Sequence, residues 1–361
     1  MSNLTLLATG DIFLGTDDAV GFLEPVAPMI RGADIAIGNL EAPASTLGEP
    51  SLEKLAYGSR HILRTKPEVV GLLRDAGFHA MSLANNHGMD FGGDALLDTL
   101  AHCDAAGIAR AGGGRDLDEA RSHAIVERDG VRIALVSMTF IYAPVSSPAR
   151  EDAPGLFCVG VDTAYAVPRN LHLAPGVWPR SVTTTRAADR AAVLESIARA
   201  KADADIVVAA CHWGLSGFAS GSAMGVPPKL GPNFLTDYQR EMGHAIVEAG
   251  ADLVVGHHPH RLQAVEFHRG KLIAYSLGNF LFSFELDFFT HTGGVLKIGI
   301  DRATKQIVSH AMLPVVMDRA AYRTRPARGA EIAEVREEIA ALSEEFSIEA
   351  AVAGDEIALR V

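Results

Sequence analysis

Short apolar runs alternate with amphipathic stretches along most of the chain, and the two patterns differ in period. Compact runs rich in β-branched residues predict buried strands at residues 4–10, 35–38, 79–84, 206–211 and 251–255. Apolar residues at helical spacing predict helices over residues 21–31, 67–76, 94–106, 187–202 and 238–249. Asp129-Gly130 is a turn signal and predicts a β-hairpin over residues 125–138. Strands that alternate with helices predict an α/β fold.

The pattern changes in the last third of the chain, where strand candidates follow one another without long helices. They occur at residues 263–266, 271–276, 294–300 and 307–316, and they predict a second, antiparallel sheet. An amphipathic helix is expected over residues 330–346. We therefore expect one domain over residues 1–320, followed by a helical extension, residues 321–361, that packs on it.

Three segments show neither the strand pattern nor the helix pattern. Residues 39–64 are loop-like, whereas residues 139–186 and 215–235 are long and rich in proline or glycine. A loop of such length in a compact domain is a functional lid or a disordered insert, and the aromatic residues of 139–186 favour a lid. Residues 215–235 follow closely after His212 in the chain. We expect both segments to lie over the site described below and to form its substrate pocket.

Composition narrows the classes of partner and compartment. The net charge of −12 argues against nucleic acid and anionic membranes, although a local metal charge can still attract an anionic substrate. The scattered cysteines Cys103, Cys158 and Cys211 predict no disulfide framework. We see neither a signal peptide nor a run long enough to span a membrane, so a soluble, cytoplasmic protein is expected. The oligomeric state is left open.

The candidate chemistry begins with three histidines within four residues, directly after the apolar run 251–255. Adjacent buried imidazoles resist being charged together, whereas a divalent metal ion binds their neutral nitrogens. Strand alternation would put His258 and His260 on one face and His257 on the other. His258 and His260 are therefore the expected metal ligands, and a solvated His-rich turn is the alternative reading of this motif.

Four more predicted strands end in the same way, with a donor residue at or just after the carboxyl end. In α/β sheets, ligands bind in the crevice at these ends. Together the strand ends supply carboxylate, amide and imidazole donors that suit one or two divalent ions (Mn, Zn or Fe) in a dinuclear-type centre. With the histidine pair, the expected ligands are Asp11, Glu41, Asn86, His212, His258 and His260.

Residues beside these ligands are candidates for catalysis. His87 follows Asn86 and is expected to transfer a proton, with a structural histidine as the alternative. Asp90 either orients His87 or a ligand, or caps the following turn.

Further residues are candidates for substrate binding, each with a structural alternative. Trp213 is either a pocket wall or a core residue, and Asn279 either touches the substrate, supports the metal ligands or forms a turn. His61 and Arg64 could meet an anionic group from the loop 39–64.

These motifs occur in the order found in a known family. The set comprises Thr9-Gly10-Asp11, Gly38-Asn39-Leu40-Glu41, Asn85-Asn86-His87, His212-Trp213-Gly214, Gly256-His257-His258-Pro259-His260 and Leu277-Gly278-Asn279-Phe280. It resembles the CapA family of poly-γ-glutamate capsule synthesis proteins, which are related to calcineurin-like metallophosphoesterases. The resemblance implies a four-layer αββα sandwich of two mixed sheets flanked by helices, with metals at the edge of the sandwich.

The resemblance also implies a division of ligands between two metals. Asp11, Glu41 and His260 would hold one ion, and Glu41, Asn86, His212 and His258 would hold the other. The superfamily usually begins with Asp-x-His, but Phe13 stands at the third position here, so the first ion has one nitrogen ligand fewer.

Three functions remain open at this point. The leading one is a metal-dependent hydrolase that acts on an amide or peptide bond, γ-glutamyl-like, or on a phosphoester, in a small-molecule or peptide substrate. The second is a metal-dependent epimerase at a peptide or amino-acid α-carbon, which the resemblance extends to lasso-peptide epimerases. The third is a non-catalytic, metal-stabilised binding protein. The sequence does not identify the substrate.

Overall fold

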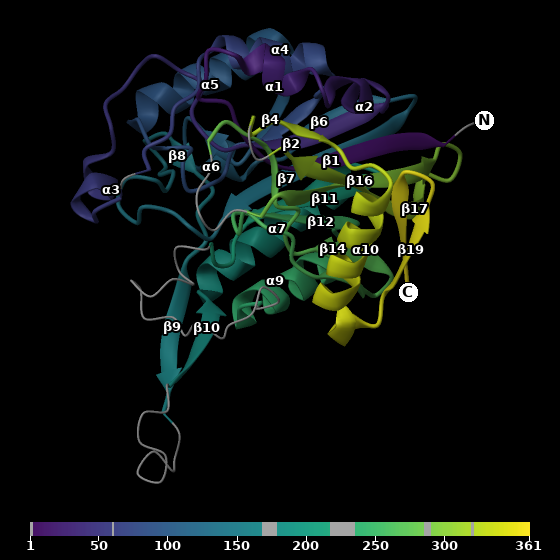
Figure 1. Cartoon of the computed structure of the whole chain (residues 1–361). Helices are drawn as coiled ribbons and strands as arrows, with labels where there is room; N and C mark the ends of the chain where they lie inside the picture. The colour runs from purple at the N-terminus through teal and green to yellow at the C-terminus, as the bar shows by residue number, and fades with distance from the viewer. Residues whose placement is uncertain (1–2, 60, 168–178, 217–234, 285–289, 319–320) are drawn as a thin grey trace.

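Two β-sheets pack face to face, and helices cover the outer face of each (Figure 1). The computed structural model describes residues 3–59, 61–167, 179–216, 235–284, 290–318 and 321–361. This arrangement confirms the expected four-layer α/β sandwich with two mixed sheets. It follows from the strand pattern, because strands buried on both faces need a cover on each side.

The larger sheet has β1 near its centre, with parallel neighbours on one side and an antiparallel neighbour on the other. Its main path runs through β19 (Glu349–Ala353), β20 (Glu356–Arg360), β17 (Gln306–Met317), β16 (Thr292–Asp301), β1 (Leu4–Phe13), β2 (Ile35–Leu40), β3 (Ala80–Ser82) and β4 (Ala109–Ala111). Two short strands complete it, β15 (Asn279–Phe282) on β1 and β18 (Thr324–Pro326) on β17.

The smaller sheet is also mixed. Its order is β13 (Val265–His268), β14 (Lys271–Ala274), β12 (Leu253–His257), β11 (Ile206–His212), β7 (Val131–Thr139) and β6 (Ala124–Arg128). β6 and β7 form the expected hairpin, with positive φ at Asp129 and Gly130. β7, β11, β12 and β14 run parallel, so their carboxyl ends meet at one edge.

Side-chain alternation along the strands divides the core into three layers. Leu4 and Leu6 of β1 face the smaller sheet, whereas Leu7 faces the outer helices. The larger sheet is covered by α1 (Ala19–Leu23), α2 (Ala27–Arg31), α4 (Glu68–Ala76) and α5 (Gly92–Ala106). The smaller sheet is covered by α7 (Ala187–Asp203) and α9 (Asp237–Glu248).

Three expectations about secondary structure need correction. The single helix over 21–31 is two helices, because Pro25 and Pro28 interrupt the backbone hydrogen bonding. The separate antiparallel sheet is wrong: the hairpin β13–β14 joins the smaller sheet, and β16–β17 joins the larger one. The loop 39–64 contains a short helix, α3 (Leu52–Ala56), which Ser51 caps.

The C-terminal part, residues 321–361, forms the expected helix and three short strands that the pattern did not predict, β18, β19 and β20. α10 (Ala330–Leu342) buries one apolar face in the core between the sheets, and β19 and β20 extend the larger sheet. The division at residue 320 stays a prediction. Among the described residues, no helix combines the length and apolar character that a bilayer crossing requires.

The segment 139–186 is more regular than expected. It contains β8 (Gly155–Leu156) and an exposed hairpin of β9 (Val161–Ala166) and β10 (Arg180–Thr185), which extends from the body of the molecule (Figure 1). Asp237, at the start of α9, pairs with Arg180 and accepts from the backbone of Thr183. Residues 168–178 of this segment lie outside the described residues, as do 217–234 of the other expected lid.

Candidate metal centre

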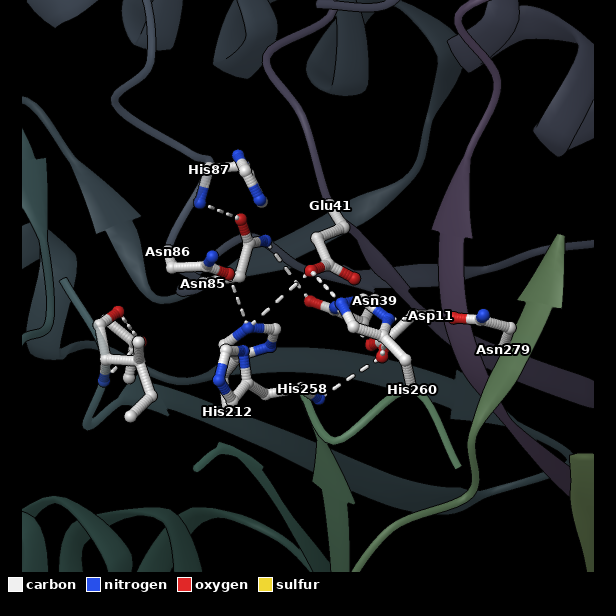
Figure 2. Close-up of polar contacts among 12 residues, drawn as sticks. Asp11, Asn39, Glu41, Asn85, Asn86, His87, His212, His258, His260 and Asn279 are labelled. Atoms are coloured by element: carbon white, nitrogen blue, oxygen red, sulfur yellow. Dashed lines mark hydrogen bonds and ion pairs between the residues drawn. The ribbon is translucent and has the colours of Figure 1, made fainter. Parts of the chain in front are cut away.

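The carboxyl ends of strands from both sheets bring the six expected ligands together (Figure 2). Asp11 lies in β1, Glu41 directly follows β2, and His212 ends β11. Asn86 follows β3, and the two remaining histidines follow β12. Gly10 permits the close approach of this edge, because a Cβ there would lie 2.0 Å from the carbonyl oxygen of Gly278.

Glu41 is the centre of the cluster. Its Oε1 lies 3.7 Å from Nε2 of both His212 and His260, and donor atoms of Glu41, His258 and His260 all lie within 4.8 Å of one another. Neither carboxylate oxygen has a hydrogen-bond partner among the described residues, although the side chain is fully buried. Burial and the nearby Asp11 carboxylate raise the pKa of Glu41 well above its usual range. A buried, unpartnered carboxylate of this kind fits a metal ligand.

Two buried amides hold Asp11 in place. Asn85 donates to Asn39 Oδ1 at 3.2 Å, and Asn39 donates to Asp11 Oδ1 at 2.8 Å. The other Asp11 oxygen accepts the backbone N–H of His258 at 3.2 Å. Sequence reasoning named Asn39 and Asn85 only as motif positions; their adjacency to Glu41 and Asn86 was the available signal. Such supports fix the orientation of a metal ligand.

The histidines reach the cluster through an unusual backbone rather than through strand alternation. β12 ends at His257, and the next two histidines have φ of +96° at His258 and +55° at His260. The two histidines do come together beside Glu41, as expected. The expected cause, a shared strand face, is wrong, because both residues lie beyond the end of β12. The left-handed conformation is costly for a residue with a side chain, and such strain concentrates at functional sites.

Burial disfavours the protonated form of the imidazoles in the cluster. Burial, together with neighbouring histidines, lowers the pKa of His212 and of His258 well below the usual range. Their rings lie 4.9 Å apart, and Nδ1 of each is buried without a partner among the described residues. Asn86 Oδ1 lies 2.7 Å from His212 Nε2. Neutral imidazoles beside carboxylate and amide oxygens form a donor set that suits zinc, manganese or iron.

His87 is held at the rim of the cluster. Its Nδ1 lies 2.6 Å from Asp90 Oδ2, and Asp90 is completely buried, so this carboxylate orients the ring. Burial lowers the pKa of His87 to about 4, and Asp90 opposes that shift. Asp90 also accepts the backbone N–H of Leu63, so it holds the loop 39–64 in place as well as the His87 ring.

Lys54 is the site residue that sequence reasoning missed. Its Nζ donates to Asp90 Oδ1 at 2.5 Å and to the carbonyl of Asn86 at 3.0 Å, and the side chain is 13% exposed. It lies on α3, within a segment that was expected to be a loop. The only sequence signal was its position between Glu41 and the other loop candidates.

A cavity of about 120 Å³ opens beside the cluster. Its lining combines the polar residues Lys54, His61 and His87 with the aromatic rings of Phe282 and Phe284. The ring of His61 stacks on Phe284, with centroids 6.3 Å apart. The full lining consists of Lys54, Ser59, His61, Asn86, His87, Ser216, His258, His260, Phe282 and Phe284.

The other substrate-binding candidates have structural roles. Trp213 is fully buried and donates its indole N–H to the carbonyl of Tyr275, so it belongs to the core and not to a pocket wall. Arg64 donates to backbone carbonyls of the loop, including that of Leu47, packs over Phe91, and is not among the residues that line the cavity. Asn279 Oδ1 lies 2.9 Å from His260 Nδ1, which fits the metal-supporting alternative.

Comparison with known proteins places the site in a family. A sequence profile described as bacterial capsule synthesis protein PGA_cap matches residues 5–283 and therefore contains all six cluster residues. The chain belongs to this family. The resemblance to CapA proteins drawn from the motifs is thereby confirmed.

Named relatives of this PGA_cap protein include capsule proteins. It is 32% identical over 269 residues to PGA biosynthesis protein CapA of Bacillus subtilis, covering 74% of this chain and 57% of that protein. It is 29% identical over 287 residues to capsule biosynthesis protein CapA of Bacillus anthracis, covering 77% and 60%. The chain thus spans less than two thirds of the length of either Bacillus protein. Among solved structures, it is similar to calcineurin-like phosphoesterase YfkN from Bacillus subtilis, with 13% identity, coverage of 96% and 98%, and a TM-score of 0.40.

In this PGA_cap chain, Phe13 stands where the phosphoesterase pattern has a histidine. Its ring contacts Phe282 and Phe284, with centroids 5.5 Å away in both cases. Phe13 therefore contributes an apolar wall beside the cavity, because both of its partners line that cavity.

Proposed function

We propose that this protein is a metal-dependent hydrolase with two divalent ions bound around Glu41. The observation that carries the proposal is the buried, unpartnered Glu41 carboxylate with imidazole nitrogens around it. A carboxylate offers two oxygens and can therefore bind two cations at once. When bound, such ions polarise the oxygen of the scissile group and activate water.

The contacts support the division of ligands that the resemblance implies. The His260 ring lies beside both carboxylates, with Nδ1 3.5 Å from Asp11 Oδ2 and Nε2 3.7 Å from Glu41 Oε1, so we assign these three residues to one ion. The 2.7 Å contact of Asn86 with His212, and the ring of His258 beside His212, group these three with Glu41 for the other. Mn, Zn and Fe all match this donor set.

His87 is the proposed proton-transfer residue. Asp90 engages Nδ1 and thereby leaves Nε2 for the substrate, while the ring lines the cavity. A neutral His87 accepts a proton at Nε2 from the attacking water, and Asp90 stabilises the imidazolium that results. The same Nε2–H then donates to the leaving group, so the ring returns to its starting state.

The proposed substrate is an anionic molecule with an amide or phosphoester bond. Lys54 lines the cavity but is paired with Asp90, so the bound divalent ions would supply the free positive charge. The rings of Phe282 and Phe284 fit the aliphatic part of a chain. The relative named for PGA biosynthesis favours a glutamyl chain among the amides.

The decisive experiment is a substrate panel in D2O. Protein loaded with Mn²⁺, Zn²⁺ or Fe²⁺ is incubated with γ-glutamyl oligomers, α-peptides and phosphate mono- and diesters. We expect cleavage of one bond class, its loss with a chelator, and no deuterium at the α-carbon of recovered substrate. Deuterium exchange without cleavage would instead support an epimerase, and metal-loaded protein that cleaves none of these classes would contradict the proposal.

A further inference from the structure

A second group of metal-type donors lies on the outer side of the smaller sheet, away from the cluster around Glu41. It comprises His244 on α9 and Glu266 and His268 on β13. His268 pairs with Lys271, the first residue of β14, whereas the Glu41 cluster lies beyond the carboxyl end of the parallel strand β12. The two groups thus occupy opposite ends of the sheet.

The donor atoms of this group converge. His244 Nε2 lies 2.7 Å from Glu266 Oε1, and donor atoms of all three residues lie within 4.8 Å of one another. The rings of His244 and His268 stack in parallel, with centroids 4.0 Å apart and 7° between their planes. This stacking keeps both imidazoles beside the Glu266 carboxylate, so three metal-type donors lie in one place.

Neighbouring groups orient each donor. Tyr275 donates its hydroxyl to Glu266 Oε2 at 2.7 Å, which leaves the other carboxylate oxygen for His244 or an ion. Glu248 Oε1 lies 3.0 Å from His268 Nε2, and Arg269 pairs with Glu248. A carboxylate behind a ligating histidine is the usual support of a protein-bound zinc ion.

We infer that His244, Glu266 and His268 bind one zinc-class divalent ion that joins α9 to β13. Two imidazoles and one carboxylate select zinc, nickel or copper over calcium and magnesium. Metal–donor bonds of about 2.0–2.2 Å place tetrahedral donors roughly 3.4 Å apart. Imidazole lone pairs lie in the ring plane, so one of the two stacked rings must turn for both nitrogens to point at the ion. The imidazoles can make that movement because their side chains are 31% and 21% exposed. Water fills the fourth position.

Binding of this ion would stabilise the folded state. Glu266 reaches it from the sheet and His244 from the covering helix, so the ion would bind the folded arrangement and not the unfolded chain. It is independent of the proposed hydrolase, and the fully loaded protein would contain three ions per chain.

The test is zinc titration of matched variants by calorimetry. His244→Phe and His268→Phe keep an aromatic ring in the stack but remove the nitrogen donors, and His102→Phe is the control at a partly exposed helix position. We expect each of the first two variants to bind one zinc ion fewer than the wild type, and the control to bind the same number. Zinc should also raise the melting temperature of the control by more than that of either variant.

The test can be repeated in a variant whose Glu41 cluster no longer binds metal. The double variant His258→Ala/His260→Ala should still bind one zinc ion that is lost when His268→Phe is added. Unchanged zinc stoichiometry in both stack variants would overturn the inference, whatever the outcome for the proposed hydrolase. If the double variant does not fold, the stack variants in the wild-type background decide the question alone.

Discussion

Replacing both His258 and His260 with alanine should remove metal from the Glu41 cluster and lower the melting temperature. Changing even a residue behind a ligand typically weakens metal binding by about 10–100-fold, so losing two ligands should exceed that range. The protein should also lose the stabilisation that comes from binding ions only in the folded state. Metal analysis after dialysis, combined with thermal unfolding, measures both effects.

The single variants and a control make this test specific. His258→Ala and His260→Ala should each reduce bound metal, because each leaves the buried Glu41 with one neighbour fewer. His102→Ala, at a partly exposed position paired only with Asp98 among the described contacts, should change neither metal content nor stability. Full metal content in both single variants would contradict a metal site that uses His258 and His260.

His87→Ala should keep its metal and lose catalysis. A positioned acid or base contributes about 10²–10⁴-fold to rate, and His87 contacts Asp90 and the cavity without being one of the proposed ligands. The measurement is kcat with the substrate class found in the panel, alongside metal analysis. A variant that loses its metal, or one that retains the wild-type rate, would contradict the proton-transfer role.

The parts of the fold that sequence reasoning predicted are those with local causes. Parallel strands end at one edge, so a donor after each apolar run was enough to predict the cluster. The hairpin over β6 and β7 followed from Asp129-Gly130, whose backbone has the required positive φ.

What sequence reasoning missed depends on long-range contacts. Strand patterns do not specify which sheet a hairpin joins, and β13–β14 and β16–β17 therefore seemed to form one sheet of their own. Arg64 seemed available to an anion because the backbone carbonyls that it binds, those of Leu47 and Gly48, lie far from it along the chain. Trp213 lies next to a ligand, but its ring turns into the core behind the site.

The same limit applies to Lys54. Its three nearest polar neighbours come from the segment after β3, more than 30 positions further along the chain. A lysine in a turn-rich segment is ordinarily a solvated side chain. Only the folded arrangement reveals that it is nearly buried between Asp90 and the cavity.

The central claim, two ions that share Glu41, is tested most directly by electron paramagnetic resonance of the protein loaded with Mn²⁺. The His268→Phe variant is the best material, because it removes the third proposed site. We expect a spin-coupled signal from paired manganese ions at full loading, and its disappearance in Glu41→Gln. The uncoupled hyperfine pattern of isolated ions at full loading would contradict the account.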